Sequence, residues 1–327
     1  MTITGVAQES LLGGRFRLDE RIGTGGTSSE FSLWKGTDRL LSRPVTIHLL
    51  PSGIPVPPGV TEAVRAAAKV SDPRLAIIYD TDFSTECPYI VSEWTRGTHL
   101  EDLVLSGLPT PALAAAMIAD AADALAVAHQ AGRPHLRLTP HSLRWDRRSG
   151  LKITGLGLDA ALYGALYESG SYGPGSFGPG SFGPGSYGPG SFGPGSLDDT
   201  RALACMLYAL LTGYWSGQGV TALPTAPRYK GRICTPRQVR AGVPALLDAI
   251  TYRAMRGEAA DAPARPLTLS GFALALHGVQ RPSYLQADPP EWVSEVSQGS
   301  RGSRPRARHA RARTGLLHGT TLLRTAD

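Results

Sequence analysis

Cysteine is scarce in this chain of 327 residues. The three cysteines, Cys87, Cys205 and Cys234, are too few and too scattered for a disulfide framework or a zinc site. They fit a reducing compartment best. No uninterrupted apolar run approaches the ~18 residues of a membrane helix, and the first ten residues, MTITGVAQES, lack the features of a signal peptide. We therefore expect a soluble, cytoplasmic protein with one large folded unit or two smaller ones.

Acidic residues are fewer than basic residues, and the basic excess lies mainly at one end of the chain. The formal net charge is +6, and the segment 301–313 alone holds Arg301, Arg304, Arg306, Arg308, Arg311 and Arg313. Such a tail attracts nucleic acid or anionic lipid by charge alone, although its composition favours a solvated, disordered end. We expect a disordered basic tail over residues 281–327, with an anionic membrane surface as a candidate contact and nucleic acid disfavoured. A truncated juxtamembrane region or an out-of-frame reading of the gene also fits this tail.

Two kinds of hydrophobic pattern succeed each other along the chain. Residues 16–50 alternate between apolar and polar with glycines between, which predicts an antiparallel meander. After a short predicted helix at 61–70 and two predicted strands near 75–79 and 89–91, the period changes at residue 110. Thr110, followed by proline, is a candidate N-cap of a helix that ends near Gly132. Further helices are predicted at 200–211, 243–256 and 268–279, so the order predicts an α+β protein with a β-rich front lobe and a helical back lobe.

A low-complexity repeat interrupts the helical half. From Gly170 to Pro194 the unit Gly-Ser-Tyr/Phe-Gly-Pro recurs five times. Glycine and proline at this density cannot hold a helix or a central strand. We expect a flexible, disordered loop over residues 166–197, with its aromatic residues serving as spacer or as weak contact points.

Several segments in this order resemble those of bacterial (actinobacterial-type) serine/threonine protein kinases, over about residues 14–280. The segment FRLDERIGTGGTSSEF resembles the first strand and the glycine-rich loop that covers nucleotide phosphates, with Gly23, Gly25, Gly26 and Ser28 at the loop positions. CPYIVSEWTRG resembles the last front-lobe strand and the hinge. There the backbone of Glu93 and Trp94 would meet an adenine edge. The resemblance implies a two-lobed protein-kinase-like fold.

The residues that carry kinase chemistry are replaced in this sequence. PVTIHLL resembles the V-A-I-K strand, but His48 stands in place of the lysine. HLRLTPHSL resembles the H-R-D-x-K-P-x-N loop and LKITGLG the D-F-G segment; by this resemblance Arg137 replaces the proton-accepting aspartate, Thr139 the phosphate-contacting lysine, Ser142 the metal-binding asparagine and Gly155 the metal-binding aspartate. The best register puts Ala63 at the helix-glutamate site, and Glu62 is about 100° away around the helix.

Two further residues match the kinase frame without being catalytic. His135 keeps the first position of the H-R-D frame, and Asp199 keeps the acidic position at the start of the central helix. The resemblance implies that Asp199 braces the catalytic-loop backbone, a structural role. No metal site is expected: His129, His135 and His141 have no cysteine or carboxylate at ligand spacing.

We therefore predict a pseudokinase, a non-catalytic signalling or scaffolding module. Mg²⁺ prefers oxygen ligands that include a carboxylate, and none remains at the two replaced metal positions. No cofactor is certain, and ATP binding without Mg²⁺ stays open. One alternative is a divergent kinase with residual ATP binding or phosphotransfer, and another is a membrane or nucleic-acid tether through the arginine tail. The predicted divisions are an extension at 1–13, an N-lobe at 14–92, a hinge at 93–97 and a C-lobe at 98–280.

The resemblance also suggests the kind of partner. It implies an active serine/threonine kinase, a forkhead-associated domain or a cell-wall assembly protein. The natural docking signal would be a phosphothreonine, because phosphate adds charge and acceptor oxygens. The candidates in the tail are Thr314, Thr320, Thr321 and Thr325.

Overall fold

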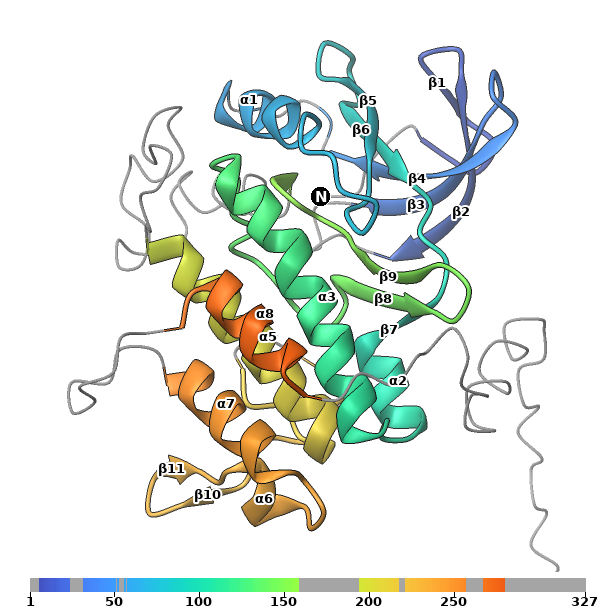
Figure 1. Ribbon diagram of the computed structural model, residues 1–327. Helices are drawn as coiled ribbons and strands as arrows, with labels where there is room; N and C mark the ends of the chain where they lie inside the picture. Colours follow the sequence, from blue (N-terminus) through green and yellow to red (C-terminus); the bar gives the residue numbers. More distant parts are fainter. Residues whose placement is uncertain are drawn as a thin grey trace, which may run out of the picture.

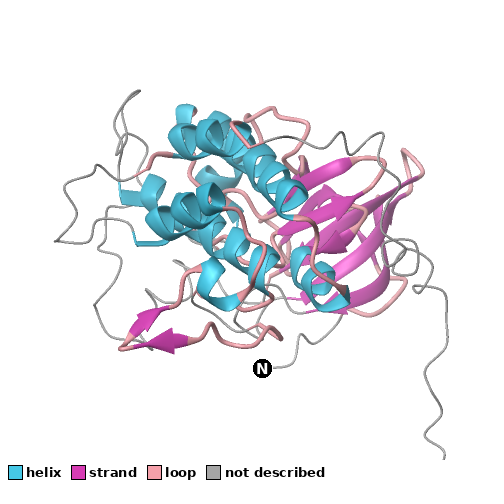
Figure 2. Cartoon of the chain, turned by 60° about the horizontal axis from the view of Figure 1, so that its bottom comes forward, coloured by secondary structure: helices cyan, strands magenta, loops and turns pink. Residues whose placement is uncertain are grey.

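The strands and helices gather in separate lobes, as the sequence pattern predicts. The computed structural model describes residues 6–23, 32–50, 52, 56, 58–158, 194–217, 221–256 and 267–279. Figure 1 shows the N-terminal sheet above a helical body, and Figure 2 shows the same separation from a second direction. The predicted α+β architecture with a β-rich N-lobe and a helical C-lobe is confirmed. The tail, most of the repeat loop and three glycine-loop positions, Gly25, Gly26 and Ser28, lie outside the described residues.

The N-lobe is a six-stranded antiparallel sheet with one helix. Its spatial order is β1-β2-β3-β4-β6-β5. The strands are β1 (Leu11–Leu12), β2 (Phe16–Gly23), β3 (Ser32–Asp38), β4 (Arg43–Leu49), β5 (Ile78–Asp82) and β6 (Tyr89–Glu93), and the helix α1 (Pro58–Ala67) lies between β4 and β5. The predicted meander over 16–50 is confirmed. The strand predicted near 75–79 begins later, because Leu75 instead pairs with Ile153 in an isolated bridge.

The two faces of this sheet serve different purposes. Alternate residues of β4 (Val45, Ile47 and Leu49) pack into a core with Phe16 of β2 and other apolar residues. On the opposite face, Ile90 packs with Val60 and Val64 of α1 and with Leu158. Because strand side chains alternate, Thr46 and His48 of β4 lie on this second face, and His48 pairs with Ile90 in the register.

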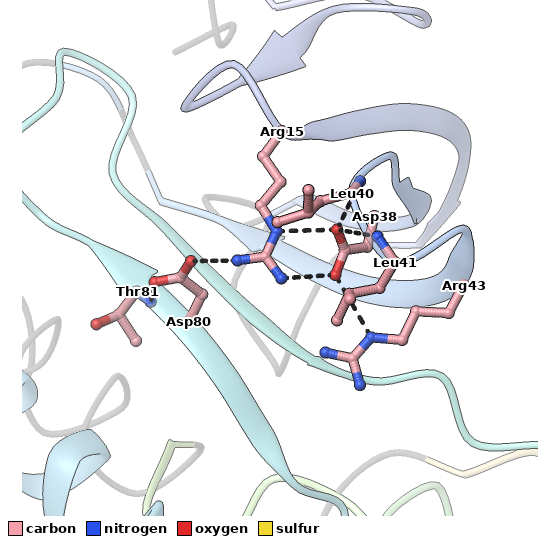
Figure 3. Close-up of polar contacts among 7 residues, drawn as sticks. All are labelled: Arg15, Asp38, Leu40, Leu41, Arg43, Asp80 and Thr81. Carbon is pink, nitrogen blue, oxygen red and sulfur yellow. Dashed lines mark hydrogen bonds and ion pairs between the residues drawn. The ribbon is translucent and has the colours of Figure 1, made fainter.

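A buried carboxylate fastens the turn between β3 and β4. Asp38 is fully buried, and both of its oxygens bind the Arg15 guanidinium at 2.9 and 2.8 Å. Figure 3 shows Arg43 and the backbone N–H groups of Leu40 and Leu41 completing the set of donors around it. These donors stabilise the charged form, so the Arg15 hydrogen bond and the other contacts lower the pKa of Asp38 to about 2. The network fixes the β3–β4 turn against β2.

The C-lobe is built around two long helices of small and apolar residues. A three-stranded antiparallel sheet and a short hairpin accompany the helices. The elements are β7 (Thr98–His99), α2 (Leu100–Ser106), α3 (Pro111–Gln130), β8 (Leu143–Asp146), β9 (Gly150–Ile153), α5 (Pro194–Thr212), β10 (Arg228–Tyr229), β11 (Arg232–Ile233), α6 (Pro236–Val239), α7 (Ala245–Arg256) and α8 (Leu269–His277). α3 and α5 share one hydrophobic core with α7 and α8.

The ends of α3 follow the expected capping chemistry. The Thr110 side chain accepts a hydrogen bond from the Leu113 N–H, and Pro111 occupies the first turn. At the other end Gly132 adopts a φ of 70°, and the Arg133 N–H donates to the Ala128 carbonyl at 2.8 Å. Both predicted ends of this helix are therefore confirmed.

α3 is also long and apolar enough, by length and composition, to span a membrane. Of its most apolar window, 61% is buried inside the protein. Its many alanines give it this hydropathy and also let neighbouring helices approach closely. α3 is therefore buried as a helix of the C-lobe core.

Candidate functional site

The second face of the N-lobe sheet, on which Ile90 also lies, carries an imidazole. His48 lies between Leu33 of β3 and Ile90 of β6 in the strand register. It is half-buried, and burial lowers its pKa to about 4. At neutral pH this position therefore holds an uncharged ring, which cannot replace a fixed ammonium against phosphate.

The helix beside the cleft offers His48 no carboxylate partner. Ala63, the residue at the expected glutamate site, has its carbonyl turned toward Gly157, where an added Cβ would lie 3.3 Å from it. Glu62 is exposed and lines a cavity together with Arg65. The structure thus places Glu62 on a different side of α1 from the Gly157 contact.

The backbone of the hinge residue Glu93 is already engaged on both sides. Its N–H donates to the Ile77 carbonyl at 2.8 Å, and its carbonyl accepts a hydrogen bond of 3.2 Å from the Thr46 hydroxyl. Its carboxylate binds Lys152 Nζ of β9, with 2.6 Å between the nearest atoms. Trp94 follows, half-buried, with the ammonium of Lys35 5.4 Å from its ring centroid.

The loop at 135–143 is held by one carboxylate. Asp199 is fully buried and accepts hydrogen bonds from the backbone N–H groups of His135 and Leu136, both at 2.7 Å. The His129 ring nitrogen lies 2.7 Å from the same carboxylate. These bonds hold Leu136 at a φ of 64°, a backbone region that costs a non-glycine residue about 1–2 kcal/mol. The strained turn persists because its N–H groups are satisfied there.

The middle of the same loop is closed by its own side chains. The Ser142 hydroxyl accepts a hydrogen bond from the Thr139 N–H at 3.1 Å and lies 3.3 Å from the Thr139 hydroxyl. Ser142 is buried, and its carbonyl accepts the Thr154 N–H at 2.9 Å. Arg137 lies half-buried between the Asp199 contacts and this turn. Ser142 therefore braces the loop and gives the site no anionic ligand.

The turn that follows β9 begins with a residue that has no side chain. Gly155 adopts a φ of 87° and Gly157 a φ of 69°, while Leu156 is buried in the C-lobe core between them. A Cβ on Gly157 would lie 2.6 Å from the Cβ of Ala67, so this turn packs directly on α1. The His135 ring nitrogen meets the Thr154 carbonyl at 2.8 Å and ties the loop to the turn.

The structure therefore brings the loop and turn positions together. Arg137, Thr139 and Ser142 share one loop, and a hydrogen bond from Thr154 links that loop to the strand just before Gly155. Gly23 is the last residue of β2. The glycine-loop positions after it lie outside the described residues. Sequence reasoning missed Thr46, although the threonine in PVTIHLL was visible in place of the V-A-I-K alanine. It also missed Lys152, because nothing in the sequence indicates that this lysine pairs with Glu93.

Comparisons of the sequence with known proteins find bacterial serine/threonine protein kinases. The chain is similar to the serine/threonine-protein kinase PknB of Mycobacterium tuberculosis, with 29% identity over 259 residues, which are 75% of this chain and 40% of the relative. It is 26% identical to PknB of Mycolicibacterium smegmatis over 93% of this chain and 48% of the relative. PknL of Mycobacterium tuberculosis is 26% identical over 78% of this chain and 63% of the relative. The chain is a relative of bacterial serine/threonine protein kinases.

Its fold is the protein-kinase fold. Among solved structures it superposes on Rad53 residues 1–466 in complex with AMP-PNP, with a TM-score of 0.54 and 17% identity over 80% of this chain and 64% of that one. No protein-family model matches the sequence. This kinase relative spans about two fifths to two thirds of the length of the curated relatives it matches.

Proposed function

We propose that this kinase relative is a pseudokinase, a signalling or scaffolding module that binds protein partners without transferring phosphate. The observation that carries the proposal is Gly155, which opens the turn where the resemblance requires a metal-binding aspartate. Phosphoryl transfer relies on Mg²⁺ to neutralise charge on the phosphates. Mg²⁺ is bound in such sites through one or two carboxylates, and glycine has no ligand atom in its side chain.

The neighbouring positions support the same proposal. Arg137 stands where a kinase places its proton acceptor, and a guanidinium cannot accept a proton at cellular pH. His48, neutral because of its lowered pKa, supplies no fixed charge to the phosphates. The Asp199 brace keeps the loop in its kinase-like shape. The proposed deficiency is therefore chemical and does not come from a misfolded loop.

The partners are part of this proposal. The relatives are named serine/threonine kinases, so an active kinase of that kind is a natural partner, as are a forkhead-associated domain and a cell-wall assembly protein. A phosphothreonine in the tail would serve as the docking signal. We propose a cytoplasmic location, with membrane association through the basic tail as a separate question for experiment.

The test is thermal unfolding of the full chain with millimolar ATP, with and without Mg²⁺, followed by a phosphotransfer assay. A ligand that binds only the folded state raises the unfolding midpoint by mass action. We expect no Mg²⁺-dependent shift and no phosphate incorporation above that of a sample without the protein, with PknB as the active control. Incorporation by this chain that requires Mg²⁺ would contradict the proposal and favour a divergent kinase.

A pair of restoring substitutions makes the experiment sharper. Gly155→Asp and Ser142→Asn together return the two metal ligands that the resemblance calls for. If the absence of these two ligands is the reason why Mg²⁺ does not bind, the unfolding midpoint of the double variant rises with ATP in an Mg²⁺-dependent way, whereas that of the unchanged chain does not. Gly150→Asp, at another glycine with positive φ and open space around it, is the matched control.

A further inference from the structure

A cavity of about 430 Å³ is lined by residues of α1 and of the loop after α3, and none of the residues at 48, 137, 139, 142 or 155 lines it. Most of its lining comes from one face of this helix and the turn after it, and Arg133 comes from the C-lobe. The lining residues are Thr61, Glu62, Arg65, Ala66, Lys69 and Arg133. In Figure 1 the C-terminal end of α3 lies below α1, which brings the loop after α3 under the N-lobe helix. The cavity therefore spans the two lobes.

The backbone brings the residues that line the cavity near one another. Thr61, Arg65 and Lys69 are spaced by four residues, so they lie one above another along a helical face. The Lys69 N–H donates to the Ala66 carbonyl at 3.2 Å, which continues the turn beyond the end of α1. Arg133 is placed by its own N–H bond to the Ala128 carbonyl in the cap of α3.

The charges in the cavity are unbalanced. Three side chains are cationic, and Glu62 is the single carboxylate. Within the ranges that the structure describes, no ion pair or hydrogen bond joins the side chains of Glu62, Arg65, Lys69 or Arg133 to another residue. Each guanidinium presents a planar fork of donors that matches the oxygens of phosphate or carboxylate. An anion in the cavity would relieve the repulsion among the cations.

We propose that this cavity binds a phosphate monoester. Its volume lies within the usual range of small-ligand sites, which suits one compact anionic group better than an extended polyanion. A phosphate monoester carries a charge of about −1.5 to −2 at pH 7, which matches the excess of three cations over one carboxylate. Arg65 and Arg133 donate to the phosphate from the two lobes, Lys69 adds charge and the Thr61 hydroxyl adds a further donor. The bound ligand holds α1 against the C-lobe, a function that needs nothing from the cleft.

The first experiment measures binding to the full chain by the shift in thermal midpoint at constant ionic strength. The probes are inorganic phosphate and a capped phosphoserine peptide, with sodium chloride and the unphosphorylated peptide as their controls. A saturable shift with either probe supports the site. Tighter binding of the peptide identifies a phosphorylated protein as the source of the ligand, whereas equal binding identifies a free phosphate compound. No saturable shift with either probe overturns the proposal.

Two variants of opposite sign test the residues. Combined Arg65→Ala, Lys69→Ala and Arg133→Ala substitutions should weaken phosphate binding by about tenfold or more, since charge-assisted bonds are lost. Glu62→Gln should strengthen it by roughly threefold, because it removes the one repulsive charge. Arg39→Ala, at an exposed cation in the β3–β4 turn, should leave it unchanged. Unaltered binding in the triple variant, or no gain in Glu62→Gln, would refute the assignment. Glu62→Gln alone decides the matter if the triple variant does not fold.

Discussion

Asp38 in the N-lobe and Asp199 in the C-lobe are both fully buried carboxylates that accept hydrogen bonds from two backbone N–H groups, but their side-chain partners differ. Asp38 is neutralised by the side chains of Arg15 and Arg43, which are themselves 30% and 33% exposed. Asp199 has the His129 ring as a side-chain partner, and its two backbone donors belong to the 135–143 loop. The first carboxylate fastens the turn between two strands, whereas the second determines the shape of a loop.

The cleft between the lobes is the opposite case. The positions where the kinase resemblance requires chemistry hold Arg137, Ser142 and Gly155, and none of these is a carboxylate. The two buried carboxylates therefore hold the fold of this chain, whereas the three positions at which the resemblance calls for catalytic groups carry no carboxylate.

The largest expected effect comes from removing the C-lobe carboxylate. Asp199→Ala leaves the N–H groups of His135 and Leu136 buried without acceptors, and we expect a loss of roughly 3–5 kcal/mol in the free energy of unfolding. Asp199→Asn keeps one acceptor oxygen and should lose clearly less. Urea denaturation of both variants measures the difference. Equal losses would mean that the bonds to the loop contribute little.

The N-lobe carboxylate should matter less and should depend on pH. Asp38→Asn should cost about 2–3 kcal/mol, because water reaches the two arginines that lose their partner. The pKa of Asp38 is lowered from 3.8 to about 2 on folding, so its stabilisation is complete above pH 4 and disappears as the pH falls through about 2. The difference between wild type and variant should shrink over that window in acid denaturation. A constant difference between pH 4 and pH 2 would count against this assignment.

The contact between the turn and α1 can be separated from backbone strain by two glycines. Gly157→Ala brings a Cβ to 2.6 Å from Ala67, whereas Gly150→Ala meets open space at a similar positive φ of 76°. The strain of the left-handed region costs each variant about 1 kcal/mol. Overpacking should add about 1–3 kcal/mol for Gly157 alone. Similar losses for the two variants in chemical denaturation would show that α1 yields easily.

The smallest expected effect concerns the neutral cleft wall. His48→Lys places an ammonium on this wall, and Ala63→Glu supplies a carboxylate from α1; the double-mutant cycle should show favourable coupling of about 1 kcal/mol. Ala68→Glu, at an exposed position near the end of the same helix, is the control and should show none. If His48→Lys coupled with Ala68→Glu and not with Ala63→Glu, then Ala63 would not be the helix residue that faces position 48.

His48 itself can be titrated by NMR. Its pKa of about 4 in the folded protein lies below the ordinary value of 6.5. The unfolded chain therefore binds the proton more readily, and the contribution of His48 to stability is complete above pH 6.5 and falls as the pH drops toward 4. A measured pKa near 6.5 would show that the His48 ring is solvated and that burial does not keep it neutral.

Local patterns predicted most of the elements because each rests on neighbouring residues. Thr110, Pro111 and Gly132 fixed the ends of α3 from cap chemistry alone. The alternation of β2 was readable as far as Leu18, but register shifts after Leu18 and Arg21 leave Ile22 39% exposed, which no local pattern shows. α5 begins at Pro194, inside the stretch where a flexible loop was predicted, since proline is well tolerated in a first helical turn.

The candidate site was only partly predictable. The replacements at 48, 137, 139, 142 and 155 could be read from the frame, because they sit at fixed spacing within short segments. The bonds of Thr46 to Glu93 and of Lys152 to Glu93 span 47 and 59 residues, and such pairings depend on how strands meet in space. The cavity that Arg133 shares with α1 depends on the packing of the two lobes, which one sequence does not determine.

The strained φ of Leu136 has a consequence for the order of folding. Its N–H reaches an acceptor 63 residues further along the chain, on a helix that follows the low-complexity repeat. Until α5 docks beside α3, nothing compensates the left-handed backbone at this turn, so the loop cannot reach its native form early. Contacts of such long sequence separation form slowly, because loop closure must precede them. The 135–143 turn should therefore acquire protection from hydrogen exchange only after the helical core does, which makes it a reporter of the last step of C-lobe assembly.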